Sequence, residues 1–317
     1  MKRMFLGLMI LLFAGCTGDG CTGEGKNARG GQKKWGGKLP IRVVATTGMI
    51  ADLAENIGGE RLRVEALMGA GVDPHLYKAT ASDITKLNGA DIIFYNGLNL
   101  EGKMGDLFVR ISRGNPFVIA VTEEMDPNTL LEPPAFQGHY DPHVWFDVML
   151  WAQAAKRIEK GLIELDPKGE ADYKAGGAKL AQKLKDLHQW SRNRSKELPE
   201  QKRILVTSHD AYNYFGRAYG FEVVGLQGIS TVTQAGLADI AKMVDFTMRN
   251  KIKAIFVETS VSPKAIQRVR DDARARGWDV QIGGELFSDA MGKEGTPEGT
   301  YEGMVRHNLN TIVEASK

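Results

Sequence analysis

Cysteine is scarce in this chain of 317 residues, which has only Cys16 and Cys21, both near the N-terminus. Two cysteines outside the candidate core exclude a fold that depends on a network of disulfides. An excess of charge of one sign is also lacking: 41 basic residues face 39 acidic ones, and without Lys2 and Arg3 the two counts are equal. Such a balance gives no reason to expect nucleic acid, or an electrostatic membrane patch, as a partner.

Hydrophobic runs long enough to cross a membrane are lacking as well. The run from Met4 to Phe13 follows two basic residues and is too short for a transmembrane helix, which is typical of a signal peptide, here residues 1–15. Ala14-Gly15-Cys16 places a cysteine directly after small residues, which predicts a lipid on Cys16 at the mature N-terminus. The mature chain is then extracytoplasmic and anchored to the cell membrane. Secretion without a lipid is the alternative, and it would allow a bridge between Cys16 and Cys21.

The segment 16–38 is rich in glycine and has almost no apolar residues. Because it cannot bury surface, we expect a flexible tether between the lipid and the folded part of the chain. The whole chain is 43% hydrophobic and 25% charged, which suits a globular protein of about two domains.

Apolar runs of strand length alternate with helical patterns from Leu39 onward, which predicts parallel sheets with crossover helices. The expected strands are Ile41–Thr46, Arg63–Leu67, Asp91–Tyr95, Pro116–Val121, Arg203–Thr207, Phe221–Val224, Ala254–Val257 and Trp278–Ile282. The prediction is an α/β fold of two parallel-sheet α/β domains, residues 39–165 and 199–317. One long rigid α-helix over residues 166–198 joins them.

The expected linking helix rests on the helical spacing of Leu180, Leu184 and Leu187. Asp166 is expected to cap its first turn, because aspartate is a favourable N-cap residue. Gly176-Gly177 is expected to weaken it, since each glycine costs about 1 kcal/mol relative to alanine in a helix.

The motifs of several common enzymes are missing. The chain has no His-Glu-x-x-His zinc protease motif and no Gly-x-Ser-x-Gly nucleophile elbow. The segment from Gly97 to Lys103 fits the start of a phosphate-binding loop, but Met104 stands where a serine or threonine would bind magnesium. We therefore interpret this match as chance.

Three histidines and an aspartate stand at the ends of apolar runs in separate parts of the chain: His75, His143, His209 and Asp289. Ligand sites of open parallel sheets form beyond the carboxyl ends of the strands, so loops from both domains can converge on one cleft. Three imidazoles and one carboxylate make a complete ligand set for a divalent transition metal. The pattern therefore predicts a metal site.

Other polar residues near these positions have less certain roles. Asp73 and Asp141 each begin an Asp-Pro-His sequence, and such an aspartate can cap a turn or orient the imidazole that follows. The sequence leaves both roles open. His139, His188 and His307 are expected to be ordinary loop, surface or core residues.

Four segments resemble the metal-binding solute-binding proteins of ABC transporters, the zinc/manganese group of the TroA type. They are Gly71–His75, Tyr140–Asp147, Val206–Ala211 and Gly283–Gly292. The similarity runs from about Ile41 to the C-terminus. It implies a metal site at the interface of the two domains, with His75, His143, His209 and Asp289 as ligands, each matched by its own motif.

The chain departs from parts of that group at two positions. Many zinc-specific relatives carry a long histidine-rich loop before the second ligand, whereas the segment from Pro133 to Asp141 is short and has only His139. Manganese-specific relatives usually have glutamate at the third ligand position, where this chain has His209.

The resemblance implies the substrate-binding protein of an ABC importer, not an enzyme. Such a protein captures one divalent metal ion as cargo and delivers it to transmembrane permease subunits that work with a cytoplasmic ATPase. Zinc is the first expectation, because imidazoles suit it and it lies above manganese in general affinity. Manganese is second and iron is not excluded. We expect a monomer that binds no nucleic acid.

Two other functions are weighed. One is a secreted metal-dependent hydrolase, although catalytic zinc usually keeps an open position that four protein ligands would fill. The other is a surface adhesin, which no feature of the sequence supports directly.

Overall fold

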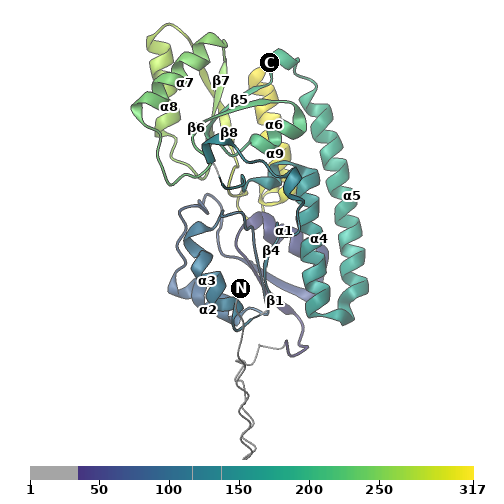
Figure 1. The fold of residues 1–317 in the computed structure, drawn as a ribbon. Coiled ribbons are helices and arrows are strands. Elements are labelled where there is room, and N and C mark those ends of the chain that lie inside the picture. Colours follow the sequence, from purple (N-terminus) through teal and green to yellow (C-terminus); the bar gives the residue numbers. More distant parts are fainter. Residues whose placement is uncertain (1–34, 116, 137) are drawn as a thin grey trace, which may run out of the picture. The chain divides into compact units, whose positions relative to one another are not determined.

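The computed structural model describes residues 35–115, 117–136 and 138–317 (Figure 1). The predicted signal peptide, the predicted lipid site at Cys16 and residues 16–34 of the predicted tether lie outside the described residues. Within the described ranges, no helix is both long enough and apolar enough to cross a membrane.

The first half of the chain builds a parallel sheet in the order β2-β1-β3-β4. Its strands are β1 (Ile41–Ala45), β2 (Leu62–Ala66), β3 (Ile92–Tyr95) and β4 (Val118–Ala120), with helices α1 (Gly48–Gly58), α2 (Ala81–Gly89) and α3 (Gly105–Ser112) between them. Neighbouring residues of β1 face opposite layers, so Val43 joins the core that contains α1 and Val44 the core that contains α2 and α3. Both faces of the sheet are therefore covered.

The second half repeats this plan. Strand β5 (Ile204–His209) pairs with β6 (Glu222–Gln227), and β7 (Ala254–Glu258) pairs with β8 (Gln281–Leu286), all in parallel. These are two separate two-stranded sheets, but β5 contacts β7, so the order β6-β5-β7-β8 corresponds to that of the first half. The helices are α6 (Asn213–Tyr219), α7 (Leu237–Arg249), α8 (Lys264–Ala275) and α9 (Tyr301–Ser316).

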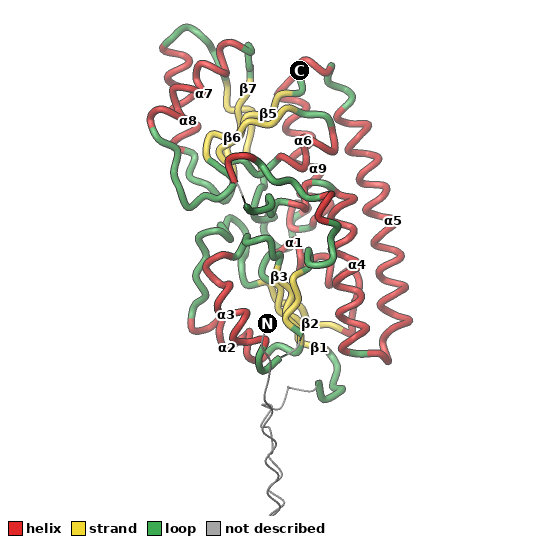
Figure 2. The backbone as a smooth tube through the Cα atoms, in the orientation of Figure 1, coloured by secondary structure: helices red, strands yellow, loops and turns green. Residues whose placement is uncertain are grey.

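Two long helices, α4 (Val148–Leu165) and α5 (Glu170–Ser195), connect the halves, and α5 runs past both of them (Figure 2). The 26 residues of α5 span about 39 Å at about 1.5 Å per residue. Arg61 of the first half pairs with Asp166 at 2.5 Å just before α5 begins, and Arg194 near its end pairs with Glu314 of α9. The long helix is therefore attached to both halves.

The details of this helix differ from the expectation. The Asp166 carboxylate does not cap it, but accepts hydrogen bonds from Arg61 and Tyr173. The helix continues through Gly176-Gly177, where it crosses its neighbours closely. A Cβ on Gly176 would lie 2.1 Å from the carbonyl oxygen of Ile57 in α1, so this glycine allows the two backbones to approach.

The predicted α/β fold of two parallel-sheet domains joined by a long helix is confirmed. The last strand begins and ends later in the chain than predicted: β8 includes Gly283 and Gly284, which were expected to follow the strand. Helix α9 packs directly on these glycines: a Cβ on Gly283 would lie 2.8 Å from Ala315, and one on Gly284 would lie 2.4 Å from Thr311. The domain limits 39–165, 166–198 and 199–317 stay a prediction.

Candidate metal centre

All four residues that the sequence predicts as metal ligands meet between the two halves of the fold. One donor atom each from His75, His143, His209 and Asp289 lies within 4.8 Å of the others, and all four side chains are buried. The Nε2 atoms of His75 and His143 are 3.3 Å apart. Asp289 places Oδ1 3.3 Å from Nε2 of His143 and Oδ2 3.3 Å from Nε2 of His209.

The loop after β2 carries His75 to the site. Gly71 adopts a left-handed conformation with φ of +72°, which suits glycine, and a Cβ there would lie 3.4 Å from the carbonyl oxygen of Thr259 in the second half. Asp73 accepts a hydrogen bond at Oδ1 from the backbone N–H of His75 at 2.8 Å. Asp73 thus caps the turn and does not orient the ring. Among the described residues, no carboxylate pairs with the ring of His75.

His143 lies in the segment before α4, and Asp141 orients it. Asp141 Oδ1 accepts hydrogen bonds from Nδ1 of His143 at 2.7 Å and from its backbone N–H at 3.0 Å. Residues of the second half hold the same segment: Asn213 donates to Asp141 Oδ2 at 3.1 Å, and the Tyr214 hydroxyl donates to the Asp141 carbonyl oxygen at 2.9 Å. Asp141 therefore has both of the roles that the sequence left open, and it leaves Nε2 of His143 to face the metal.

His209 is the last residue of β5, and Glu258 is the last residue of the neighbouring strand β7. Glu258 is 2% exposed and accepts two hydrogen bonds from His209, from the backbone N–H at 2.8 Å and from Nδ1 at 2.5 Å. A ring that donates from Nδ1 presents Nε2 to a metal. Sequence reasoning did not identify Glu258. Its position after the apolar run Ala254–Val257 was the available signal, but only the contact between β5 and β7 shows that Glu258 lies beside His209.

Asp289 follows β8, and its neighbour Ser288 is held by Trp145, whose Nε1 donates to the Ser288 carbonyl oxygen at 3.0 Å. Within the described part of the chain, neither carboxylate oxygen of Asp289 has a hydrogen-bond partner, and neither does Nε2 of His209. A buried carboxylate without donors is unfavourable. The donor atoms that lack partners are thus those that a cation between the imidazoles and the carboxylate would satisfy.

Nearby carboxylates raise the pKa of two of the imidazole rings, whereas burial lowers the pKa of the third. Burial by itself lowers the pKa of His143, but Asp141 and Asp289 outweigh it and raise this pKa to about 9. In the same way Glu258 and Asp289 outweigh burial and raise the pKa of His209 well above its ordinary value. Burial lowers the pKa of His75 to about 4. Protons therefore bind to His143 and His209 more tightly than to an ordinary histidine, and a metal ion that binds these rings competes with the protons.

The donor spacing fits metal coordination. Three donor pairs are 3.3 Å apart and all four donor atoms lie within 4.8 Å of one another, so one ion with ligand distances of about 2.0–2.2 Å could contact all four residues. Because the two oxygens of Asp289 face different imidazoles, this carboxylate can also bind through both oxygens. The residues present can hold one divalent ion.

The remaining histidines stay outside the cluster, as predicted. His139 is exposed, His188 lies against Tyr219, and His307 lies against Phe287.

The segment that resembles a phosphate-binding loop has another role. The buried carboxylate of Glu101 accepts hydrogen bonds from the backbone N–H groups of Asn96 at 2.7 Å and Gly97 at 3.3 Å. These amides therefore bind the chain's own carboxylate in place of a phosphate.

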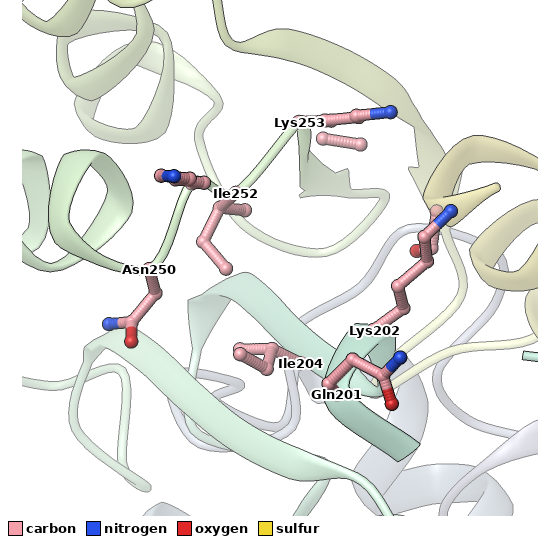
Figure 3. A pocket seen from close by; sticks show the side chains of 9 residues that line it. Gln201, Lys202, Ile204, Asn250, Ile252 and Lys253 are labelled. Atoms are coloured by element: carbon pink, nitrogen blue, oxygen red, sulfur yellow. The ribbon is translucent and has the colours of Figure 1, made fainter. Parts of the chain in front are cut away.

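A cavity of about 210 Å³ lies in the second half (Figure 3). It is lined by Gln201, Lys202, Ile204, Asn250, Lys251, Ile252, Lys253, Ala254 and Ser316. Ile204 and Ala254 begin β5 and β7, whereas His209 and Glu258 end them, so this cavity is at the opposite end of the strands from the metal centre. Its lining contains no carboxylate and no imidazole.

A buried centre of three imidazoles and one carboxylate, held between two α/β domains that share a long helix, defines a metal-binding solute-binding protein. The sequence model of the family described as zinc-uptake complex component A, periplasmic, matches residues 43–315. The chain belongs to this family. Membership confirms the resemblance and the prediction that the chain is a substrate-binding component of an ABC metal transporter and not an enzyme.

Individual relatives divide between two metals. The chain is 48% identical over 278 residues to the manganese-binding lipoprotein MntA of Bacillus subtilis, covering 87% of this chain and 90% of the relative. It is also 48% identical over 273 residues to the zinc-binding protein TroA of Treponema pallidum, covering 86% and 88%. The solved structure of the periplasmic zinc-binding protein TroA from Treponema pallidum matches with a TM-score of 0.85 at 46% identity, covering 87% of this chain and 99% of that one.

Proposed function

We propose that this protein binds one divalent transition-metal ion through His75, His143, His209 and Asp289 on the outer side of the cell membrane. It delivers the ion to the transmembrane permease subunits of an ABC importer, which a cytoplasmic ATPase drives. The buried carboxylate of Asp289, whose two oxygens face imidazoles and have no hydrogen-bond partner in the described chain, carries this proposal.

Zinc is our first choice for the cargo and manganese our second. Three imidazole nitrogens and one carboxylate suit zinc, and their donor atoms all lie within 4.8 Å of one another. The relatives leave the choice open, because one named for manganese and one named for zinc are both 48% identical to this chain. Binding of Asp289 through both oxygens would raise the coordination number, which favours manganese.

Two further parts of the proposal concern regions outside the site. The lipid on Cys16 anchors the chain, and residues 16–38 let the folded part reach the permease. Several relatives are named lipoproteins, which supports this anchor. The protein acts as a monomer, because each chain supplies all four ligands.

The site is tested by alanine substitution of each ligand. The changes His75→Ala, His143→Ala, His209→Ala and Asp289→Ala should each weaken zinc binding at least a hundredfold in competition titrations, while the wild-type protein binds one ion. His188→Ala and His307→Ala are matched controls and should leave affinity unchanged. If any two of the four ligand variants keep wild-type stoichiometry and affinity, the assignment is wrong.

The cargo is tested by elemental analysis of protein purified without added metal, together with His209→Glu. A carboxylate is a harder ligand than an imidazole, so this change should lower zinc affinity more than manganese affinity. An unchanged ratio of the two affinities in a variant that still binds one ion would show that the ligand type at this position does not set the preference.

A further inference from the structure

One hydrogen bond connects the loop that carries His75 to the second half of the fold. The Thr231 hydroxyl, in the segment between β6 and α7, donates to Asp73 Oδ2 at 2.6 Å. The other oxygen of the same carboxylate accepts the hydrogen bond from the His75 backbone. Among the described residues, this is the one side-chain hydrogen bond between residues 67–76 and the second half.

Thr231 is also connected to His209, another of the four proposed ligands. His209 is paired with Gln227 across β5 and β6. The Gln227 side chain donates to the Thr231 carbonyl oxygen at 3.0 Å, and this bond fixes the backbone that carries the hydroxyl. Gln227, Thr231 and Asp73 therefore connect His209 in the second half to His75 in the first half without the help of a metal ion.

His75 depends on this link more than the other imidazoles do. The ring of His143 is held by Asp141 and the ring of His209 by Glu258. His75 is held through its backbone by Asp73. If Asp73 lost its partner across the interface, the His75 loop would have no other side-chain hydrogen bond to the second half among the described residues.

The neighbourhood of Thr231 suggests a specific task for its hydroxyl. Thr231 is 5% exposed, whereas the next residues, Val232 and Thr233, are exposed. The segment thus lies at the surface and turns this hydroxyl inward. Because the residues that follow Thr231 are exposed, this part of the segment can move without disturbing a core.

We propose that Thr231 is a positioning residue that holds the His75 loop over the bound metal and thereby sets the rate of metal release. The proposal rests on the metal site proposed above. Release requires His75 to leave the ion, and this requires Asp73 to separate from Thr231. The bond acts on the closed, loaded state and has no part in the first encounter between the ion and the other three ligands.

The test is Thr231→Val, which keeps the shape of the side chain and removes the hydroxyl. Zinc-loaded protein is mixed with an excess of a chromophoric chelator, and absorbance gives the dissociation rate; a second experiment gives the association rate. Loss of a hydrogen bond to a carboxylate should raise the dissociation rate about tenfold, equivalent to about 1.4 kcal/mol. The association rate should change less than about twofold.

Two further variants separate this role from general damage to the fold. Thr231→Ser keeps a hydroxyl and should restore slow release, whereas Thr233→Val is the matched control in the exposed part of the segment and should behave like the wild type. The inference is overturned if Thr231→Val releases zinc within twofold of the wild-type rate, if Thr233→Val has the same effect, or if association slows as much as dissociation accelerates. Failure of the wild-type protein to bind zinc would instead refute the proposed function.

Discussion

The substitution Glu258→Gln should weaken metal binding although Glu258 does not face the metal. The carboxylate accepts two hydrogen bonds from His209, one from the backbone N–H and one from Nδ1. Glutamine offers one acceptor and one donor in the same space. If its amide nitrogen faces Nδ1, the ring must carry its proton on Nε2, which then cannot bind a metal. If it faces the backbone, two donors meet in a buried position.

Either arrangement loses one buried hydrogen bond, which costs about 1–3 kcal/mol. Changes to groups that orient a metal ligand typically reduce affinity about 10–100-fold, which agrees with this range. A second effect of the substitution increases metal affinity at acidic pH. Glu258 raises the pKa of His209 against the effect of burial, so glutamine should lower this pKa and reduce competition from protons at acidic pH. We therefore expect a loss of about 10–100-fold at pH 8 and a smaller loss at pH 6.

Zinc affinity of both proteins would be measured at pH 6, 7 and 8 by competition with a chelator of known affinity. Glu222→Gln is the matched control, because Glu222 is an exposed residue at the start of β6 and the chemical change is the same. The reasoning is refuted if Glu258→Gln stays within about threefold of the wild type at pH 8, or if its loss grows as the pH falls.

Two other predictions follow from the described residues and a third from the sequence around Cys16. Because the pKa of His143 is raised to about 9, binding must displace a proton below that pH, and zinc affinity should fall about tenfold per pH unit per proton from pH 8 to pH 6; constant affinity would contradict this. Gly176→Ala should lower the melting temperature by an amount equivalent to about 1–3 kcal/mol, because its Cβ meets the backbone of Ile57, whereas Gly105→Ala in open space should not. Cys16→Ser should move the protein from the membrane fraction to the soluble fraction, and an unchanged distribution would argue against the lipid.

The cluster of three histidines and one aspartate could be predicted because each of these residues lies in a recognisable segment at the end of an apolar run. Strand positions were predictable for the same reason, since apolar β-branched runs mark buried parallel strands. The shift of β8 could not be predicted from local pattern. Gly283 and Gly284 look like turn residues, but they are needed because α9 lies directly against the strand.

The residues that orient the ligands were harder to predict than the ligands. Asp141 was a candidate because it is two positions from His143, whereas Glu258 is 49 positions from His209 and is brought to it by the contact of β5 with β7. A glutamate at the end of a strand usually belongs to the surface. Only the tertiary structure distinguishes this buried residue from an exposed one.

The attachment of α5 at both ends affects how this protein could be used as a metal sensor. Arg61 with Asp166 and Arg194 with Glu314 fix the helix to the two halves, so the distance between dyes placed near its ends should change little when metal binds. A fluorescence pair would respond better across the bond between Asp73 and Thr231. One dye on the exposed side chain of Leu76 and another at position 233 would report loop closure directly.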